Sequence, residues 1–350
     1  MPGMRPTLQF DAYSLTTLID AVKEASEILS GGIDSGSPDE QIYHPIWYRG
    51  HTNTGRTYKL LPGLYRDNEL SHLEARLAEE SRIQHYSARA IQSIENRPHT
   101  STDWLELMQH YQVKTRLMDW SENMFIAAMF ALEPFISNPK DERFKNSRRL
   151  STPSIWLLNP ILLNKKIYGM LHADTDIIDK ALMEFSNLPS GLQRKMKEQL
   201  KKGEGEYFSV KGNPRSGIVN LSLLLDLRIA ASNRLPELLN DNRFNPFYYL
   251  LLKLYNDGVM LDVEVPPLAV VSPFHSKRIE TQHGVFTVFP FPPGSGAVTA
   301  IEENPDCYGV LAEIRLNNPY GIAKDLRTKG FLRTDLYPDL TEYGQSIEWR

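Results

Sequence analysis

Apolar residues fill every position from Phe125 to Leu132, so no side of this segment is suited to water. Ser121 is a suitable cap for a helix that contains the run, and Pro134 is expected to end that helix. A helix that is apolar all round has to be covered by other elements on every side. The chain is therefore expected to fold around this helix and to hold rigidly whatever leads into it.

Polar side chains crowd the segment before this helix, which reads QHYQVKTRLMDWS at residues 109–121. Asp103 and Glu106 have the spacing of a capping box for a helix that ends near His110, and residues 114–119 then form a loop. A buried charge that has no partner costs several kcal/mol, so charged residues in apolar, buried sequence need a partner. Similar clusters occur in WYRGH, at residues 47–51, and in KRIETQHGVF, at residues 277–286.

Composition narrows the class of protein. The chain has 350 residues, of which 41% are hydrophobic, which is enough for one large core or two modest ones. The net charge of -4 gives no general attraction to nucleic acid or anionic membranes. Its single cysteine, Cys307, excludes an intrachain disulfide and a multi-cysteine metal site. No segment has 18 consecutive apolar residues, so we expect a cytoplasmic protein without a membrane partner.

Known short motifs are absent from the sequence. We find no glycine-rich phosphate loop, no HExxH pair and no GxSxG elbow, and the nine histidines are scattered without the spacing of a zinc site. The function therefore has to be sought in the three polar clusters.

The order of the predicted elements favours an α+β fold. A helix should run from a cap at Ser14 to Gly31, followed by a short strand at 46–49 and a long helix at about 69–94. Later segments with strand character are 155–158, 259–263, 268–271, 285–289 and 310–314. We expect a mixed or antiparallel central sheet of short strands flanked by helices, with a mainly helical insertion at about 160–255.

Several of these stretches together resemble the FRG-domain family, which is named for an aromatic-Arg-Gly motif. They are WYRG at 47–50, QHYQVKTRLMDWS at 109–121, RIETQHGVF at 278–286 and the closing stretch 326–340. The resemblance implies an FRG domain over residues 41–345, preceded by a helix and loop at 1–40. The sequence departs from the family pattern at Trp47-Tyr48, where the name implies Phe, and at Gln112, where glycine is expected. A glycine there would permit a positive φ, which costs other residues about 1–2 kcal/mol.

The resemblance implies a function. Family members are largely bacterial and phage-associated, and the family has a suggested remote similarity to ADP-ribosyltransferases, which use NAD. In that fold a strand-borne Arg or His holds NAD, an aromatic ring stacks on nicotinamide, and a late Glu or Gln lies beside the ribose. By their order in the chain, Arg49, Tyr111 and Gln282 are matched to these roles. The implied protein is an NAD-using enzyme of bacterial defence or toxin type, with a macromolecular acceptor that the sequence does not identify.

Chemistry extends this hypothesis to further residues. Cleavage of the nicotinamide glycosidic bond passes through an oxocarbenium-like state, so the site has to fix phosphates and ribose. Arginine holds phosphate through two hydrogen bonds at once. The predicted catalytic residues are Arg49, His110, Tyr111 and Gln282, and the predicted cofactor-binding residues are Arg49, Arg116, Asp119, Trp47 and Arg278. Glutamine cannot take up a proton, so a base would have to be Glu280 or Asp119.

Each cluster also has a purely structural interpretation. Arg116 and Asp119 have the spacing of a buried ion pair, Arg49 could hold loop carbonyls, and Arg278 and Gln282 could make hydrogen bonds at a strand edge. A non-catalytic module that binds a nucleotide or a partner tail is the alternative function. Nucleic-acid binding through the basic stretches 143–149 and 194–202 is not favoured, because the chain is acidic overall. The interpretations differ in whether Arg49, Arg116 and Gln282 line one cavity.

Overall fold

The structure is a computed structural model. It describes residues 7–31, 45–53, 58–66, 70–90, 101–137, 152–173, 265–271, 277–291 and 297–337, together with a few isolated positions. Most of the predicted helical insertion, the predicted strand at 259–263 and nearly all of the two basic stretches lie outside the described residues. No helix in the described part of the chain is long and apolar enough to cross a membrane.

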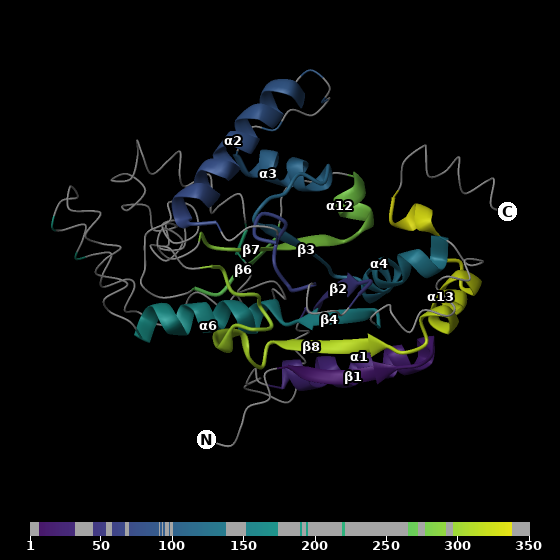
Figure 1. Ribbon diagram of the computed structural model, residues 1–350. Coiled ribbons are helices and arrows are strands. Elements are labelled where there is room, and N and C mark those ends of the chain that lie inside the picture. The colour runs from purple at the N-terminus through teal and green to yellow at the C-terminus, as the bar shows by residue number, and fades with distance from the viewer. Residues whose placement is uncertain are drawn as a thin grey trace.

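Helices and strands are interspersed along the described chain (Figure 1). The strands are β1 (Leu8–Ala12), β2 (Trp47–His51), β3 (Leu117–Ser121), β4 (Ser154–Leu158), β5 (Val219–Asn220), β6 (Leu268–Val271), β7 (Gly284–Val288) and β8 (Leu311–Leu316). The helices are α1 (Leu15–Ser30), α2 (His72–Ala90), α3 (Ser101–His110), α4 (Met124–Ser137), α6 (Pro160–Ala173), α12 (Lys277–Thr281) and α13 (Pro319–Thr328). Short 3-10 turns, η2 (Pro305–Cys307) and η3 (Arg333–Asp335), complete the set.

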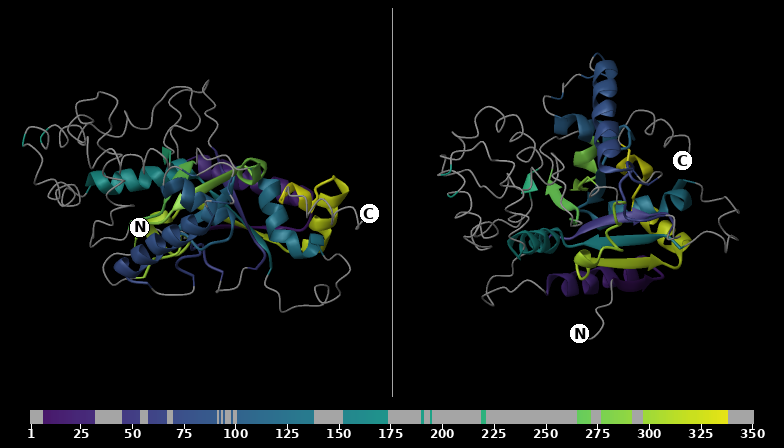
Figure 2. Two further views of the ribbon diagram at one scale, coloured as in Figure 1. Left: turned by 90° about the horizontal axis from the view of Figure 1, so that it is seen from above. Right: turned by 60° about the vertical axis from the view of Figure 1, so that its left-hand side comes forward.

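The described strands form one mixed sheet in the order β1-β8-β4-β2-β3-β7-β6-β5. β1 is parallel to β8 and β5 is parallel to β6, whereas the other neighbours are antiparallel. The predicted α+β fold with a mixed sheet of short strands is therefore confirmed. Figure 2 shows α2 projecting away from this sheet, with α3 beside its base.

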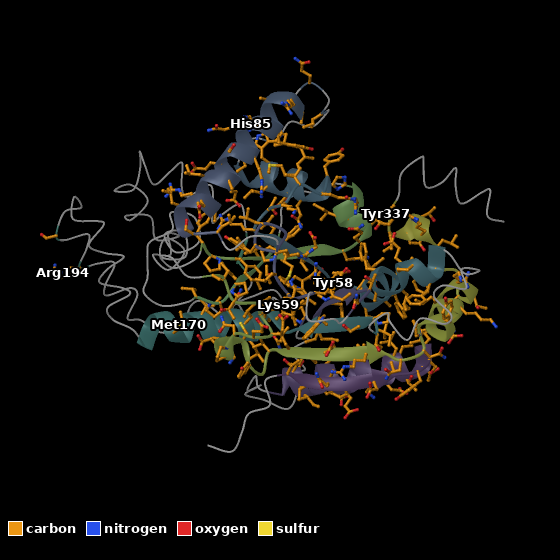
Figure 3. The ribbon with its side chains drawn as sticks, in the orientation of Figure 1. Tyr58, Lys59, His85, Met170, Arg194 and Tyr337 are labelled. Atoms are coloured by element: carbon orange, nitrogen blue, oxygen red, sulfur yellow. The ribbon has the colours of Figure 1, made fainter. Side chains whose placement is uncertain are left out.

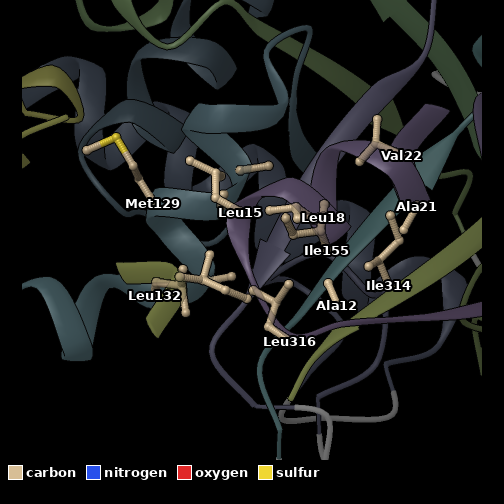
Figure 4. Close-up of a cluster of buried hydrophobic side chains, with 14 of the residues drawn as sticks. Ala12, Leu15, Leu18, Ala21, Val22, Met129, Leu132, Ile155, Ile314 and Leu316 are labelled. Carbon is tan, nitrogen blue, oxygen red and sulfur yellow. The ribbon is translucent and has the colours of Figure 1, made fainter. Parts of the chain in front are cut away.

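Apolar side chains pack on both faces of the sheet. Every residue of β4 is buried, and its side chains alternate between the two faces. Ile155 and Leu157 belong to a core with α1, α4 and α13 (Figure 4). Trp156 and Leu158 belong to a second core that includes Trp47, Trp120 and Phe289. The apolar material predicted from composition thus forms two cores that share one sheet.

The apolar helix is α4, and its residues from Ile126 to Met129 are buried as predicted. The prediction that Pro134 ends it is wrong, since the helix continues to Ser137. Phe135 is buried and packs edge-on against Tyr320 of α13, with ring centroids 5.1 Å apart. This apolar contact holds the last turn although proline removes a backbone hydrogen bond.

Residues 117–121 form strand β3, so the prediction of a loop at residues 114–119 is wrong for residues 117–119. Ser121 is the last residue of that strand rather than the cap of α4, and Asn123 Oδ1 accepts the hydrogen bond from Phe125 N, 2.9 Å away. β3 pairs with β7 over its whole length. Because Asp119 is part of a strand, its position is fixed by the sheet.

Other boundaries differ in smaller ways. The Ser14 cap is confirmed, and it forms a capping box with Thr17. The proposed Asp103 cap is wrong, because α3 begins at Ser101. Strand β1 and helix α13 were not predicted. Residues 278–281, expected at a strand edge, belong to the short helix α12.

Candidate functional site

A cavity opens where strands β2 and β3 diverge. β2 pairs with β4 from Trp47 to His51, but its only register pair with β3 joins Tyr48 to Ser121. Beyond this bridge the strands separate, and a cavity of about 260 Å³ lies among β2, β3, β7 and the helices α3, α4 and α12. The residues around it are Tyr48, Arg49, Gly50, Glu106, Gln109, His110, Asp119, Trp120, Ser121, Ala127, Phe130, Arg278, Ile279, Gln282, Gly284 and Phe286.

This lining joins the three polar clusters that are distant in the sequence. Arg49, His110, Asp119, Arg278 and Gln282, all named as site residues from the sequence, lie on the wall of the same cavity. They come from β2, α3, β3, α12 and the turn after α12. A set of separate helix caps and strand edges would not have to share one space, so this convergence favours a ligand site.

The aromatic-Arg-Gly motif occupies β2, and each of its residues has a separate role. Tyr48 and Arg49 line the cavity. Trp47 has no exposed surface and lies in the second core, so it is not available to a cofactor, and its predicted cofactor role is not supported. Gly50 lies against α4, where a Cβ atom would be 2.0 Å from the carbonyl oxygen of Ala127. The aromatic residue of the motif that reaches the cavity is therefore Tyr48.

Arg49 is held on both sides. Its Nε donates a hydrogen bond to His51 Nε2, 3.2 Å away, and its Nη1 donates to the backbone oxygen of Asp119. Burial lowers the pKa of Arg49 to about 10, while the carboxylate of Asp119 acts in the opposite direction. The guanidinium therefore remains charged at neutral pH and bridges the gap between β2 and β3.

Burial, together with the positive charge of Arg49, lowers the pKa of His51 to about 3. In the unfolded chain the imidazole titrates near 6.5, so between these values the unfolded state binds more protons than the folded state. The stability that neutral His51 contributes is thus present above pH 6.5 and is lost as the pH falls.

We expect His51→Gln to flatten the pH dependence of the free energy of unfolding in this range. One proton corresponds to a slope of up to about 1.4 kcal/mol per pH unit, and urea titrations from about pH 7 to about pH 4 would measure it. His85→Gln is the control, because His85 is exposed on α2. Equal slopes for His51→Gln and the unaltered protein would contradict this account.

Asp119 is tied to α3 through a chain of side-chain hydrogen bonds. Gln109 Nε2 donates to Asp119 Oδ2 at 2.8 Å, and Thr115 Oγ1 donates to Gln109 Oε1 at 2.6 Å. Thr115 Oγ1 also accepts a hydrogen bond from Leu117 N at 3.2 Å. The predicted Asp119 thus lies on the cavity wall with a fixed orientation.

Arg278 and Gln282 project from α12 and the turn that follows it. Arg278 Nη1 donates to the backbone oxygen of His110 at 3.3 Å, and Gln282 Nε2 donates to the backbone oxygen of Leu336 at 2.7 Å. Ser121 Oγ donates to the backbone oxygen of Gln282 at 2.7 Å, which fixes the turn to β3. Burial and the nearby Arg278 lower the pKa of His110 below its ordinary value, so its imidazole is neutral at neutral pH.

Two polar residues that α3 contributes to the cavity wall were not predicted as site residues from the sequence. Glu106 has no exposed surface and Gln109 is partly buried, and both lie on α3 with His110. Glu106 is three residues before Gln109 and four before His110, so all three lie on one helix face. This spacing could have revealed them, but the capping-box interpretation had assigned Glu106 to the start of the helix.

Besides Trp47, two further predicted site residues lie outside the cavity. Arg116 is buried in an ion pair with Glu79 of α2, with Nε 3.0 Å from Glu79 Oε2, and so is not placed to hold phosphates. The predicted ion pair of Arg116 with Asp119 is wrong, because Glu79 is the acidic partner. Tyr111 has 60% of its surface exposed and does not line the cavity, so its assignment to nicotinamide stacking is not supported.

Gln112, which stands where the family motif has glycine, adopts a positive φ. Its φ is 62°, and the hydrogen bonds Val113 N to Met108 O and Gln112 N to Gln109 O form a Schellman ending for α3. Helix α13 ends in the same way, with Gly330 at φ 91°. Gln112 occupies the equivalent position at the end of α3. Its backbone is therefore strained, whereas Gly330 adopts the same conformation without strain.

We expect Gln112→Gly to raise the free energy of unfolding by up to about 1 kcal/mol, because glycine adopts this conformation without strain. Gln112→Ala is the matched control and should give no such gain, since alanine has a Cβ atom as well. Urea denaturation of the three proteins measures the effect, and an equal gain with alanine would contradict the conformational explanation.

Comparison with known proteins identifies one family. The family model for the FRG domain matches residues 44–140, which extend from just before β2 to just beyond α4. No curated protein and no solved structure was found to match the chain. Among the described residues, no group of three or more His, Cys, Asp or Glu side chains is arranged to hold a metal ion. The matched range includes Tyr48, Arg49, Gly50 and the polar face of α3, so the part of the chain that matches the FRG domain supplies much of the cavity wall.

Proposed function

We propose that the cavity binds NAD, or a closely related phosphate-bearing nucleotide, and that the protein is an ADP-ribosyltransferase-like enzyme of bacterial defence or toxin type. The observation that supports the proposal is the meeting of Arg49, Glu106, Arg278 and Gln282 at one cavity. Together these residues supply cations for phosphate, a carboxylate for a developing positive charge and an amide for a ribose hydroxyl.

The cationic part of the site is formed by Arg49 and Arg278. Within the described residues, the hydrogen bonds of Arg49 use Nε and Nη1, and those of Arg278 use Nη1. Each guanidinium therefore retains at least one N–H-bearing nitrogen for an anion. Two arginines that are already held by the protein bind phosphate at a small further cost in side-chain entropy.

The carboxylate of Glu106 is suited to the chemical step. As the bond to nicotinamide breaks, positive charge develops on the ribose, and a buried carboxylate stabilises it more strongly than an exposed one would. Glu106 can also accept a proton from an attacking hydroxyl, which Gln282 cannot do. Neutral His110 and the side-chain oxygen of Gln282 are suited to accept hydrogen bonds from ribose hydroxyls.

The size of the cavity points to the part of NAD that it would hold. Pockets that enclose a drug-sized ligand have volumes of about 300–1,000 Å³, and this cavity has about 260 Å³. It would accept the nicotinamide-ribose end, and the adenosine end would extend outside. The half-buried rings of Tyr48 and Phe130 are available to stack on nicotinamide, the role first given to Tyr111.

The test is to incubate the purified protein with NAD and cell extract, which supplies macromolecular acceptors, and to measure released nicotinamide. Glu106→Gln keeps the shape of the side chain and removes its charge, and should lower kcat by about 10²–10³-fold. Arg49→Lys should mainly raise KM, because lysine cannot make two parallel hydrogen bonds to phosphate. Glu80→Gln is the control, because Glu80 lies on α2 outside the cavity. Absence of NAD consumption at high protein concentration would overturn the proposal.

A non-catalytic binding module is the second candidate, and the protein contacts of Arg49 and Gln282 favour it. Arg49 holds β3, and Gln282 holds Leu336, so both residues also support the fold. A binding module would give saturable calorimetric binding of NAD or ADP-ribose without release of nicotinamide. Steady nicotinamide release that is lost in Glu106→Gln would reject it.

A further inference from the structure

The C-terminal segment, defined as residues 331–337, lies along α4. Phe331 stacks on Phe125 with ring centroids 5.0 Å apart, and Arg333 Nη2 is 3.7 Å from Glu133 Oε1. Leu336 is buried in the same core as α4. The segment is thus packed against the helix that forms one side of the cavity.

The end of this segment contacts three residues of the cavity wall. Gln282 Nε2 donates to the backbone oxygen of Leu336 at 2.7 Å. The guanidinium carbon of Arg278 is 4.9 Å from the centre of the Tyr337 ring, and Phe130 meets the same ring edge-on at 6.2 Å. In Figure 3, Tyr337 lies beside α12 and the last described turn of the chain. The cavity is therefore supported by residues 331–337, which lie far beyond the range 44–140 that matches the FRG domain.

We propose that Tyr337 is a positioning residue for Arg278, so that the C-terminal segment completes the cationic wall of the cavity. A long arginine side chain has many rotamers, and a contact with the face of an aromatic ring favours one of them. The backbone oxygen of His110 fixes one edge of the same guanidinium. Tyr337 and His110 together hold Arg278 at the cavity.

This arrangement couples the segment to the ligand, a consequence that rests on the proposed function. The docked ring of Tyr337 favours one position of the Arg278 guanidinium. An anion that binds Arg278 favours the same position. By reciprocity, docking of the segment strengthens anion binding and a bound anion strengthens docking. The C-terminal segment is therefore a place where the affinity of the cavity for phosphate-bearing ligands is set.

The reactivity of individual arginines tests the proposal without any ligand. Phenylglyoxal modifies accessible guanidinium groups, and mass spectrometry of peptides gives the rate at each arginine. We expect Tyr337→Leu to raise the rate at Arg278 by about 3-fold or more, the factor that corresponds to one lost cation–π contact. Tyr337→Phe, which keeps the ring, should leave the rate unchanged. Equal rates at Arg278 in Tyr337→Leu and the unaltered protein would overturn the proposal.

Internal references separate this effect from unfolding. Arg49 makes no contact with Tyr337 in the described structure and should react at the same rate in all variants, and buried Arg116 should stay unreactive. Tyr337→Met is a second ringless variant should Tyr337→Leu expose Arg116. Arg333→Met removes the other guanidinium near the ring, 5.4 Å from its centre, and should leave Arg278 unchanged. An equal rise at Arg278 in Arg333→Met would count against a specific role of Tyr337.

A second measurement distinguishes the inference from the proposed function. ADP-ribose and inorganic pyrophosphate should slow the modification of Arg49 and Arg278 in the unaltered protein, and the affinity should fall in Tyr337→Leu. If neither compound protects any arginine, the proposed anion site fails while the ligand-free test of Tyr337 still stands. If both protect equally in Tyr337→Leu, the cavity binds anions and the positioning role of Tyr337 is rejected.

Discussion

Gly50→Ala is expected to cost about 3 kcal/mol or more of stability, because the added Cβ atom would overlap the backbone of α4. The ideal Cβ position lies 2.0 Å from the carbonyl oxygen of Ala127 and 2.6 Å from the backbone nitrogen of Ala131. Backbone atoms cannot rotate away as a side chain can, so β2 and α4 would have to separate. A loss of this size is a large part of the about 5–15 kcal/mol that stabilises a typical domain.

Gly169→Ala is the matched control for this substitution. Gly169 lies in helix α6, and a Cβ atom there would meet nothing within 4 Å. Alanine favours a helix over glycine by about 1 kcal/mol, so this variant should be as stable as the unaltered protein or slightly more stable. Urea denaturation measures both variants. Adding Ala127→Gly to Gly50→Ala should not restore stability, because the overlap is with backbone atoms, and a full rescue would contradict the explanation.

The glycine of the aromatic-Arg-Gly motif is thus required for packing, whereas the aromatic residue and the arginine are placed on the cavity wall. Gly50 allows α4 to approach β2, and Tyr48 and Arg49 then lie on the cavity wall beside Ala127. A variant that separates β2 from α4 would also displace Arg49. We therefore expect Gly50→Ala to weaken ligand binding together with stability, whereas Arg49→Lys should weaken binding with a smaller loss of stability, because it leaves the packing of β2 on α4 intact.

Sequence patterns were sufficient where local chemistry decides the structure. The cap at Ser14, the buried helix from Phe125 and the mixed sheet follow from cap residues, apolar runs and β-rich segments. The cavity residues Arg49, His110, Asp119, Arg278 and Gln282 could be named because polar groups in apolar surroundings are uncommon. Each of these inferences depends on residues that are close in the sequence.

The sequence did not predict which face of a strand a side chain occupies, or which partners it contacts far away in the chain. Neighbouring side chains of a strand point to opposite faces, and WYRGH does not indicate whether Trp47 or Tyr48 faces a ligand. The start of β3, residues 117–119, was interpreted as part of a loop, because the strand pairs with β7, more than 160 residues away. Glu106 was assigned to a cap, since the same carboxylate spacing serves both a helix start and a helix face.

Arg116 shows the same limit most clearly, because its partner Glu79 is on a different helix. Arg116 Nε donates to Glu79 Oε1 and Oε2 at 3.1 and 3.0 Å, and its Nη1 donates to the backbone oxygen of Phe289 at 3.3 Å. The guanidinium also lies 4.6 Å from the centre of the Phe291 ring. Only 3% of the Arg116 side chain and 8% of the Glu79 side chain are exposed. This pair joins α2 to the strands β3 and β7 beside the second core.

Glu79→Gln is therefore expected to lower the free energy of unfolding by about 3–5 kcal/mol, because it removes the charge that balances a buried guanidinium. Arg116→Met should cost a similar amount, since it leaves the carboxylate of Glu79 buried without that cation. Glu80→Gln is the control on the same helix. It alters a partly exposed pair with Arg76, 3.2 Å apart, and should cost less than about 0.5 kcal/mol.

The double variant Glu79→Leu with Arg116→Met tests the physical reason. Replacing both charges with apolar side chains removes the cost of burying either ion alone, so the double variant should be more stable than Glu79→Gln or Arg116→Met. Urea denaturation of this double variant and of the single variants Glu79→Leu and Arg116→Met gives the coupling energy between the two positions. If the losses simply add, the pair is not coupled and the packing of each side chain explains its own effect. Because Arg116 lies outside the cavity, the Glu79 and Arg116 variants that fold should keep the affinity of the cavity for its ligand.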